Sequence, residues 1–241
     1  MTKTYANKMT VEEIRNRFEN DVERFTKLET GQTSIPDAAL MMSLITRAAC
    51  VTTPGMKHTL DIGCGAGNNT LKLLQSKPNL NCDLLDLSAN MLTKARERVS
   101  AVTDGEVTTH RGDFRELPLK EESYDIIMAA AVLHHLRDEE DWERAFSKLY
   151  EITAPGGSVW ISDLISHESP HIQEIMESHY SDYLISVDGE GYRDKVLAAI
   201  EMEDTPRPLT FQLDLLKKVG FSEVVVLHKT NCFAAFGAIK E

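Results

Sequence analysis

The stretch from Thr59 to Thr70 reads Thr-Leu-Asp-Ile-Gly-Cys-Gly-Ala-Gly-Asn-Asn-Thr, and the rest of the chain is interpreted from it. Its first four residues are typical of a buried strand, and a helical pattern begins near Asn69. Gly63, Gly65 and Gly67 lie between them at alternate positions. Glycine permits positive φ and has no Cβ to hold a ligand away, while the start of a helix offers unpaired N–H groups. The stretch therefore predicts a strand, a ligand-binding loop and a helix.

A second acid, Asp86, ends the next predicted strand, 82–87. An acid about twenty residues past such a loop can bind both hydroxyls of a ribose, so the pair predicts a nucleoside cofactor. The glycines follow a Gly-x-Gly-x-Gly spacing rather than the Gly-x-Gly-x-x-Gly of dinucleotide-binding proteins, and Asp61 precedes them. Because Asp61 would repel a pyrophosphate and attract an ammonium group, the residues favour S-adenosylmethionine.

Four motifs resemble those of class I S-adenosylmethionine-dependent methyltransferases. They are 61–67, 85–91, the adenine-binding turn 112–114, and the turn 154–158 before the fifth strand. The resemblance implies that Asp113 accepts a hydrogen bond from the adenine amino group. The residues expected at the cofactor are Asp61, Gly63, Cys64, Gly65, Gly67, Asp86, Leu87, Met91, Gly112, Asp113, Phe114 and Ala130.

Strands alternate with helices along most of the chain, which predicts an α/β fold with a Rossmann-like, doubly wound, mostly parallel sheet. The resemblance implies seven strands, of which the last two form an antiparallel C-terminal hairpin. We expect a single methyltransferase domain over residues 1–241. The expected strands are 59–62, 82–87, 107–110, 124–131, 157–164, 224–227 and 232–239, and the expected helices after the N-terminal region are 69–76, 88–99, 141–150 and 210–219.

Two regions depart from this alternation, and we expect them to form a helical cap. One comprises N-terminal helices within 10–50, beginning with a helix from Thr10 to Phe25 in which Thr10 and Glu13 form a capping box. The other is an insertion, 166–208, with two helical patterns; the alternative is that it forms only a dimer surface. The side chains considered for substrate contact in this lid are Asp163, His167, His171, Tyr180, Tyr183 and Tyr192.

Composition limits the partners. The formal net charge is -12, from 38 acidic and 26 basic residues, which suits nucleic-acid phosphates poorly and favours a small-molecule substrate. No apolar run approaches the ~20 residues that span a bilayer. The N-terminal residues are polar and do not read as a secretory signal, so we expect a cytoplasmic protein without a membrane partner. A homodimer is also considered.

The segment 129–136 follows the fourth predicted strand and contains His134 and His135. Either histidine is a candidate to hydrogen-bond the acceptor or take its proton, and the alternative is that one packs against Trp142. Methyl transfer depends mainly on alignment, so no universal catalytic residue is expected. No metal site is expected, because the pair His167 and His171 lacks a third ligand at a suitable spacing.

A narrower resemblance concerns the carboxy-S-adenosylmethionine synthases, through 18–22, 34–36, 218–221 and 231–236. These enzymes need a cation for the extra carboxylate of their cofactor, and Arg193 and Lys195 are the candidates here. Because the glycine loop keeps the ordinary methyltransferase form, we rank methyl transfer to a small molecule first and synthase-like chemistry second. A non-catalytic S-adenosylmethionine-binding protein and a nicotinamide oxidoreductase are the rivals from other classes.

Overall fold

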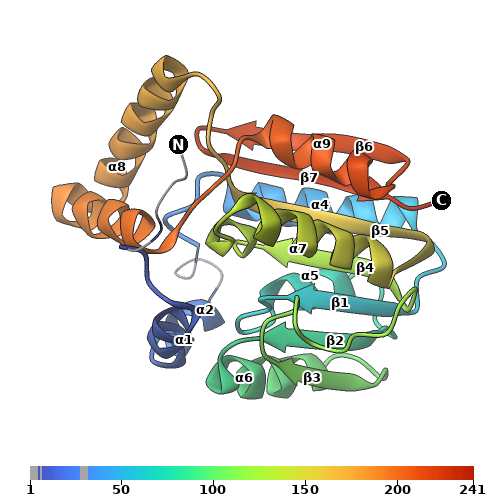
Figure 1. Cartoon of the computed structure of the whole chain (residues 1–241). Helices are drawn as coiled ribbons and strands as arrows, with labels where there is room; N and C mark the ends of the chain where they lie inside the picture. Colours follow the sequence, from blue (N-terminus) through green and yellow to red (C-terminus); the bar gives the residue numbers. More distant parts are fainter. Residues whose placement is uncertain (1–4, 6, 28–31) are drawn as a thin grey trace.

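The computed structural model describes residue 5 and residues 7–27 and 32–241. At its centre lies one seven-stranded sheet in the order β3-β2-β1-β4-β5-β7-β6 (Figure 1). The first five strands run parallel, and β7 pairs antiparallel with both β5 and β6. The predicted mostly parallel sheet with a terminal hairpin is therefore confirmed. The strands are β1 His58–Ile62, β2 Asn81–Asp86, β3 Val107–Arg111, β4 Tyr124–Ala130, β5 Thr153–Leu164, β6 Glu223–Thr230 and β7 Phe233–Ile239.

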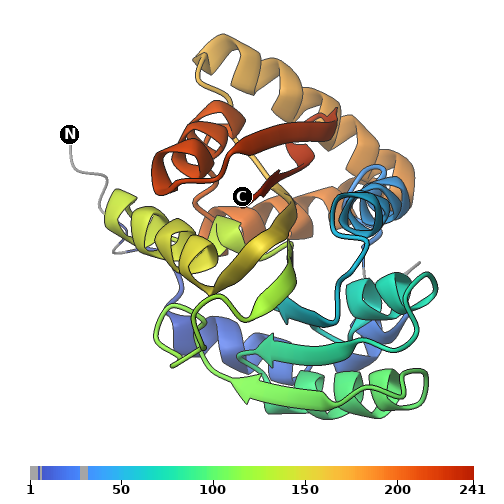
Figure 2. The same cartoon turned by 90° about the vertical axis from the view of Figure 1, so that its right-hand side faces the viewer.

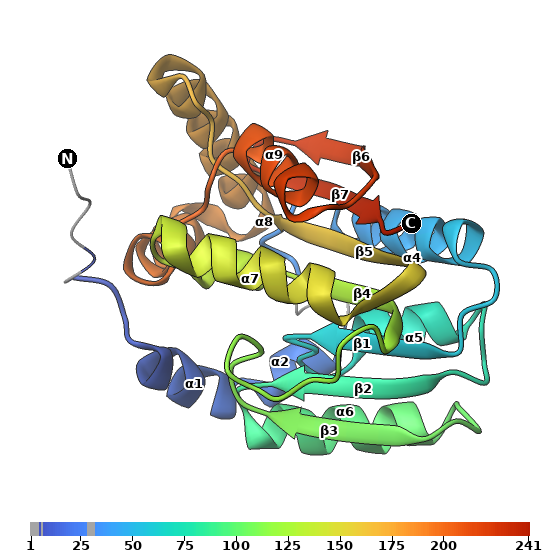
Figure 3. The same ribbon diagram turned by 45° about the vertical axis from the view of Figure 1, so that its right-hand side comes forward.

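Helices cover both faces of the sheet, as Figures 2 and 3 show. On one face α7 and α9 bury large side chains such as Trp142 and Phe146, and on the other α4, α5 and α6 bury side chains such as Met41 and Leu73. Parallel strands buried on both faces explain the near-continuous apolar run of β4. These helices are α4 Ala38–Thr52, α5 Asn68–Leu74, α6 Ala89–Ser100, α7 Glu139–Ile152 and α9 Leu209–Val219.

The N-terminal helix begins as predicted but is divided. Both hydrogen bonds of the capping box between Thr10 and Glu13 are present at the start of α1 (Val11–Glu19). The expected continuation to Phe25 is wrong, because the chain leaves the helix after Asn20 and forms a second short helix, α2 (Val22–Thr26). Figure 1 shows both helices beyond the carboxyl ends of β1 and β2.

The insertion contains one long element, α8 (Pro170–Glu203), interrupted by non-helical backbone at Asp188 and Gly189. Gly189 adopts φ +77°, which ends the first arm and lets the second leave at an angle (Figure 1). The two predicted helical patterns correspond to these arms. Among the described residues, no helix is both long and apolar enough to cross a bilayer.

One buried carboxylate joins four neighbouring strands. Asp83 on β2 accepts hydrogen bonds from His58 on β1 at 2.9 Å, from His110 on β3 at 2.8 Å and from Tyr124 on β4 at 2.8 Å. Burial opposes ionisation of Asp83, but these donors outweigh it and lower its pKa. The hydrogen bond to Asp83 in turn raises the pKa of His58.

This arrangement predicts a pH-dependent contribution to stability. Because the folded pKa of His58 lies above its ordinary value of about 6.5, its contribution is complete below that pH and is lost as pH rises through the folded pKa. We expect His58→Gln to lower the free energy of unfolding by about 1 kcal/mol at pH 6 and by less at pH 9. Urea unfolding of both proteins at each pH measures the difference, and an equal difference at both pH values would contradict the prediction. When Asp83→Asn is already present, His58→Gln should change the free energy of unfolding by the same amount at pH 6 and pH 9.

Candidate cofactor and substrate site

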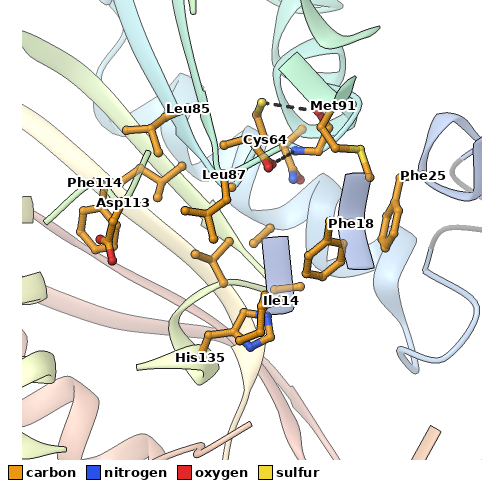
Figure 4. A pocket seen from close by; sticks show the side chains of 18 of the residues that line it. Ile14, Phe18, Phe25, Cys64, Leu85, Leu87, Met91, Asp113, Phe114 and His135 are labelled. Carbon is orange, nitrogen blue, oxygen red and sulfur yellow. Dashed lines mark hydrogen bonds between the residues drawn. The ribbon is translucent and has the colours of Figure 1, made fainter. Parts of the chain in front are cut away.

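A pocket lies at the carboxyl ends of the parallel strands, between the loops that follow β1 to β4 on one side and α1 and α2 on the other (Figure 4). Open parallel sheets bind ligands at this edge. Most of the residues expected at the cofactor line it. They are Gly63, Cys64, Gly65, Asp86, Leu87, Met91, Gly112, Asp113, Phe114 and Ala130, whereas Asp61 and Gly67 lie behind the lining.

The three alternate glycines all have left-handed backbone. Their φ values are +62° at Gly63, +51° at Gly65 and +83° at Gly67. Residues other than glycine rarely adopt such a backbone conformation. A Cβ at Gly65 would meet no protein atom within 4 Å, so the space beside this residue is open to a ligand. Gly67 instead serves packing, because a Cβ there would lie 3.2 Å from Val99 on α6.

Asp86 links the end of β2 to the glycine loop. Its Oδ2 accepts from the Gly65 N–H at 2.9 Å, and its Oδ1 accepts from the Ser88 N–H at 2.9 Å. Each carboxylate oxygen can accept a further hydrogen bond, so both remain available to ribose hydroxyls. Burial raises the pKa of Asp86 against these hydrogen bonds.

Asp61 lies behind the loop and fixes the start of α5. Its Oδ2 accepts from the Thr70 N–H at 3.2 Å and from the Thr70 hydroxyl at 2.7 Å. Its Oδ1 is buried and has no hydrogen-bond partner among the described residues. Burial raises the pKa of Asp61 to about 7, and the negative charge of Asp86 adds to the effect. A positively charged group bound nearby would stabilise the ionised carboxylate.

Asp113 lines the pocket at the turn after β3. Its carboxylate accepts from Arg115 through Nε at 3.0 Å, and Arg115 also contacts Asp141 at the start of α7. Burial opposes ionisation of Asp113, but Arg115 outweighs it and lowers the pKa. The carboxylate is therefore held in place as an ionised acceptor.

The wall of the pocket opposite the glycine loop comes from α1 and α2. Ile14, Phe18 and Phe25 point into it, with the rings of the two phenylalanines 5.7 Å apart (Figure 4). The insertion contributes no lining residue among those described. This differs from the expectation that its tyrosines face the substrate.

The tyrosines of α8 have other partners. Tyr180 donates to the Ser34 carbonyl and Tyr183 to the Thr33 carbonyl, each at 2.9 Å. These bonds hold the segment that leads to Ile35, which does line the pocket. Tyr180 and Tyr183 therefore support the wall from behind.

Side chains near the end of α1 attach it to the rest of the domain. Glu19 accepts from the backbone N–H groups of Ala89 and Asn90 at the start of α6, each at 3.0 Å. Arg17 forms an ion pair with Glu203, a buried residue at the end of α8. Sequence spacing gave no sign of these contacts, because the partners lie far apart in the chain.

The two candidate catalytic histidines occupy the turn after β4 but differ in exposure. His135 lines the pocket, whereas His134 is buried between Asp163 and Asp204. Burial opposes a charge on His134, but Asp163 and Asp204 outweigh it and raise its pKa to about 9. The structure thus brings together both histidines and Asp163, and adds Asp204, which the sequence did not single out.

We expect Asp86→Ala to weaken binding of S-adenosylmethionine by about 1.5–3 kcal/mol, because hydrogen bonds to a charged group are lost. Calorimetric titration measures the affinity. Asp86→Asn keeps the shape and should lose less, and Asp104→Ala, in an exposed loop, should bind as the unaltered protein does. Unchanged affinity in Asp86→Ala would remove this residue from the ribose site.

We also expect cofactor binding to release part of a proton near pH 7. The pKa of Asp61 is about 7 in the free protein, and a bound cation would lower it, so the neutral fraction would ionise. Calorimetry in two buffers of different ionisation enthalpy measures the release, which should decrease well above pH 7. Asp61→Asn should abolish it, and an undiminished release in that variant would assign the proton to another group.

Comparison with known proteins agrees with the fold and with the expected cofactor. Residues 59–157 match a family model described as a methyltransferase domain. The carboxy-S-adenosyl-L-methionine synthase of Shewanella sp. (strain ANA-3) is 28% identical over 187 residues, which cover 75% of this chain and 74% of the relative.

Two solved structures share the fold at low sequence identity. Human N-acetylserotonin methyltransferase, in complex with S-adenosylmethionine, matches 94% of this chain with a TM-score of 0.59 and 18% identity. An O-methyltransferase family protein from Burkholderia thailandensis matches 93% with a TM-score of 0.65 and 14% identity. This chain spans only 56% and 62% of their lengths. The matched methyltransferase domain, the shared fold and the glycine loop joined to an acid on the second strand make this chain similar to S-adenosylmethionine-dependent methyltransferases.

Proposed function

We propose that this protein transfers the methyl group of S-adenosylmethionine to a small molecule that binds beside His135, beneath α1. The observation that carries the proposal is the composition of the pocket. It runs from the glycine loop to an apolar wall, in which the imidazole of His135 is a polar exception. The strongly negative net charge supports a small acceptor over a nucleic acid.

The residues present fit the cofactor. Gly65 leaves open space beside the loop, Asp86 offers acceptors for a ribose, and the unpartnered Oδ1 of Asp61 adds negative potential behind the loop. Asp113 is available to the adenine amino group. When bound, S-adenosylmethionine supplies an electrophilic methyl group on a sulfonium.

The contribution of the protein to the reaction is alignment in a site shielded from water. Holding two reactants in line can supply about 7–11 kcal/mol of a barrier. Phe18 lies with its ring centroid 6.2 Å from that of His135, so the apolar wall and the imidazole border the same space. The Nδ1 of His135 faces Asp204, and no described residue hydrogen-bonds its Nε2. We assign Nε2 to a hydrogen bond with the acceptor.

The residues that line the pocket also indicate the chemical class of the acceptor. Ile14, Phe18, Phe25 and Leu136 suit a molecule with an apolar, planar body that carries one polar group. Aromatic walls gain additional energy from stacking with such a body.

Carboxy-S-adenosylmethionine synthase-like chemistry ranks second. Its cofactor product carries a carboxylate that requires a cation, and among the described lining residues the cation is Arg115, which already binds Asp113 and Asp141. Arg193 pairs with Asp194 on α8, outside the pocket lining. Mass spectrometry of the nucleoside product separates the two reactions, because only the synthase reaction yields a product with an additional carboxyl group.

Oligomeric state and location stay predictions. The exposed Ile172 and Ile175 on α8 support the predicted homodimer, and light scattering after gel filtration tests it. The cytoplasmic location is tested by fractionation of cells that produce the protein.

We expect His135→Phe to lower kcat/KM for methyl transfer about 10- to 100-fold, through loss of one hydrogen bond to a polarised acceptor. The assay follows labelled methyl groups from S-adenosylmethionine into pools of small apolar acceptors. Cofactor affinity should be unchanged, and His171→Gln, an exposed change on α8, serves as the matched control. If the unaltered protein binds the cofactor but labels no acceptor, a non-catalytic binding function replaces the proposal.

A further inference from the structure

We propose that His134, His135 and Asp204 bind one divalent transition-metal ion at the edge of the substrate pocket. The histidines lie in the turn after β4, and Asp204 follows the last residue of α8. One ligand atom from each side chain lies within 4.8 Å of the other two. The sequence predicts no metal site when only residues close together in the chain are compared. Asp204 lies about seventy residues after the two histidines, so that comparison does not include it.

The spacing of the ligand atoms fits a metal ion. The Oδ1 of Asp204 lies 3.0 Å from Nδ1 of His135 and 3.6 Å from Nε2 of His134. Zinc bonds of about 2.0–2.2 Å to nitrogen and oxygen place neighbouring ligands of a tetrahedral ion about 3.3 Å apart. The two observed distances lie on either side of this value, so small side-chain shifts would complete the site.

The same atoms lack other partners. Nδ1 of His135 and Oδ1 of Asp204 are buried, yet neither forms a well-directed hydrogen bond with any described residue, including the other. The Asp204 residue is only 8% exposed, and a buried carboxylate oxygen that has ionic neighbours but no well-directed hydrogen bond is unfavourable. A cation between the two atoms would satisfy both.

Asp163 provides the outer support that metal-binding histidines commonly have. Its Oδ1 contacts Nδ1 of His134, and its Oδ2 accepts from the Leu133 N–H at 2.7 Å. A carboxylate on one imidazole nitrogen fixes the ring and leaves the other nitrogen free for a metal. In His134 that other nitrogen, Nε2, is the one that faces Asp204.

The local charge also favours a cation. Among the described residues, the close ion pairs of Asp163 and Asp204 are with the two imidazoles, whereas Arg17 pairs with Glu203 and acts on Asp204 from farther away. Lys8 and Arg137 donate to backbone carbonyl oxygens of this segment, at Asp204 and Glu203 respectively. Two imidazoles and one carboxylate form a ligand set that suits first-row divalent ions.

The consequence for catalysis rests on the proposed function. Because His135 lines the pocket, the ion would lie in its wall, and an oxygen donor of the acceptor would take an open coordination position. Metal binding itself requires neither acceptor nor cofactor, so it is measured separately from methyl transfer.

The test uses the full chain, without a histidine tag, after treatment with a chelator. Titration with Zn²⁺ against a chromophoric competitor should show one ion bound per chain. We expect Asp204→Asn to lower the affinity at least 100-fold, and Asp163→Asn to lower it about 10- to 100-fold. His171→Gln and His58→Gln, which change histidines outside this cluster, should bind Zn²⁺ as the unaltered chain does.

A second measurement on the unaltered chain keeps the proposal independent of how the variants fold. Bound Co²⁺ should give visible bands without thiolate charge-transfer absorption, because no cysteine belongs to the site. The metal site would be overturned if the unaltered chain did not bind Zn²⁺ stoichiometrically or if Co²⁺ gave thiolate bands. It would also be overturned if the two control variants lost as much Zn²⁺ affinity as Asp204→Asn does. None of these results would affect labelled methyl transfer as a test of the proposed function.

Discussion

The fold of this site depends on the end of one strand, β2. The carbonyl oxygen of Leu85 accepts from Cys64 in the loop after β1, and the carbonyl of Asp86 accepts from Gly112 in the turn after β3. The Asp86 side chain then holds Gly65 and Ser88. Three loops that carry the cofactor residues are thus fixed to two neighbouring residues. The left-handed backbone of the glycine loop is stable because of these bonds, and the position of the ligand follows from them.

Carboxylates recur at this edge of the sheet. Asp61, Asp86, Asp163 and Asp204 are mostly buried near strand ends or the turn after β4. Buried negative charge without matching arginine or lysine is costly unless a cation compensates it. The sulfonium and ammonium of the cofactor suit one end of this region, and a divalent ion suits the other. The electrostatics of the pocket therefore favour cationic ligands, and its apolar wall is the basis of the proposed acceptor.

Local patterns in the sequence were sufficient for the sheet and for most of the residues that line the pocket beside the glycine loop. Alternating apolar runs, the glycine spacing and the capping box at Thr10 depend on residues close together in the chain. Contacts between distant segments could not be predicted this way. The pairing of Glu19 with α6, the place of Asp204 beside two histidines, and the support of the wall by Tyr180 depend on how α1 and α8 pack. The break at Asn20 was also missed, because the apolar spacing continues through it.

The attachment of α1 has a kinetic consequence. Its side chains line the pocket, and ionic and charge-assisted contacts through Arg17 and Glu19 attach the helix to the rest of the domain. Such contacts weaken as ionic strength rises. The residence time of a bound nucleoside would then be governed by how often the helix detaches, and salt would shorten it without altering the sheet beneath. Exchange of spent for fresh cofactor can in this way be faster than any opening of the core.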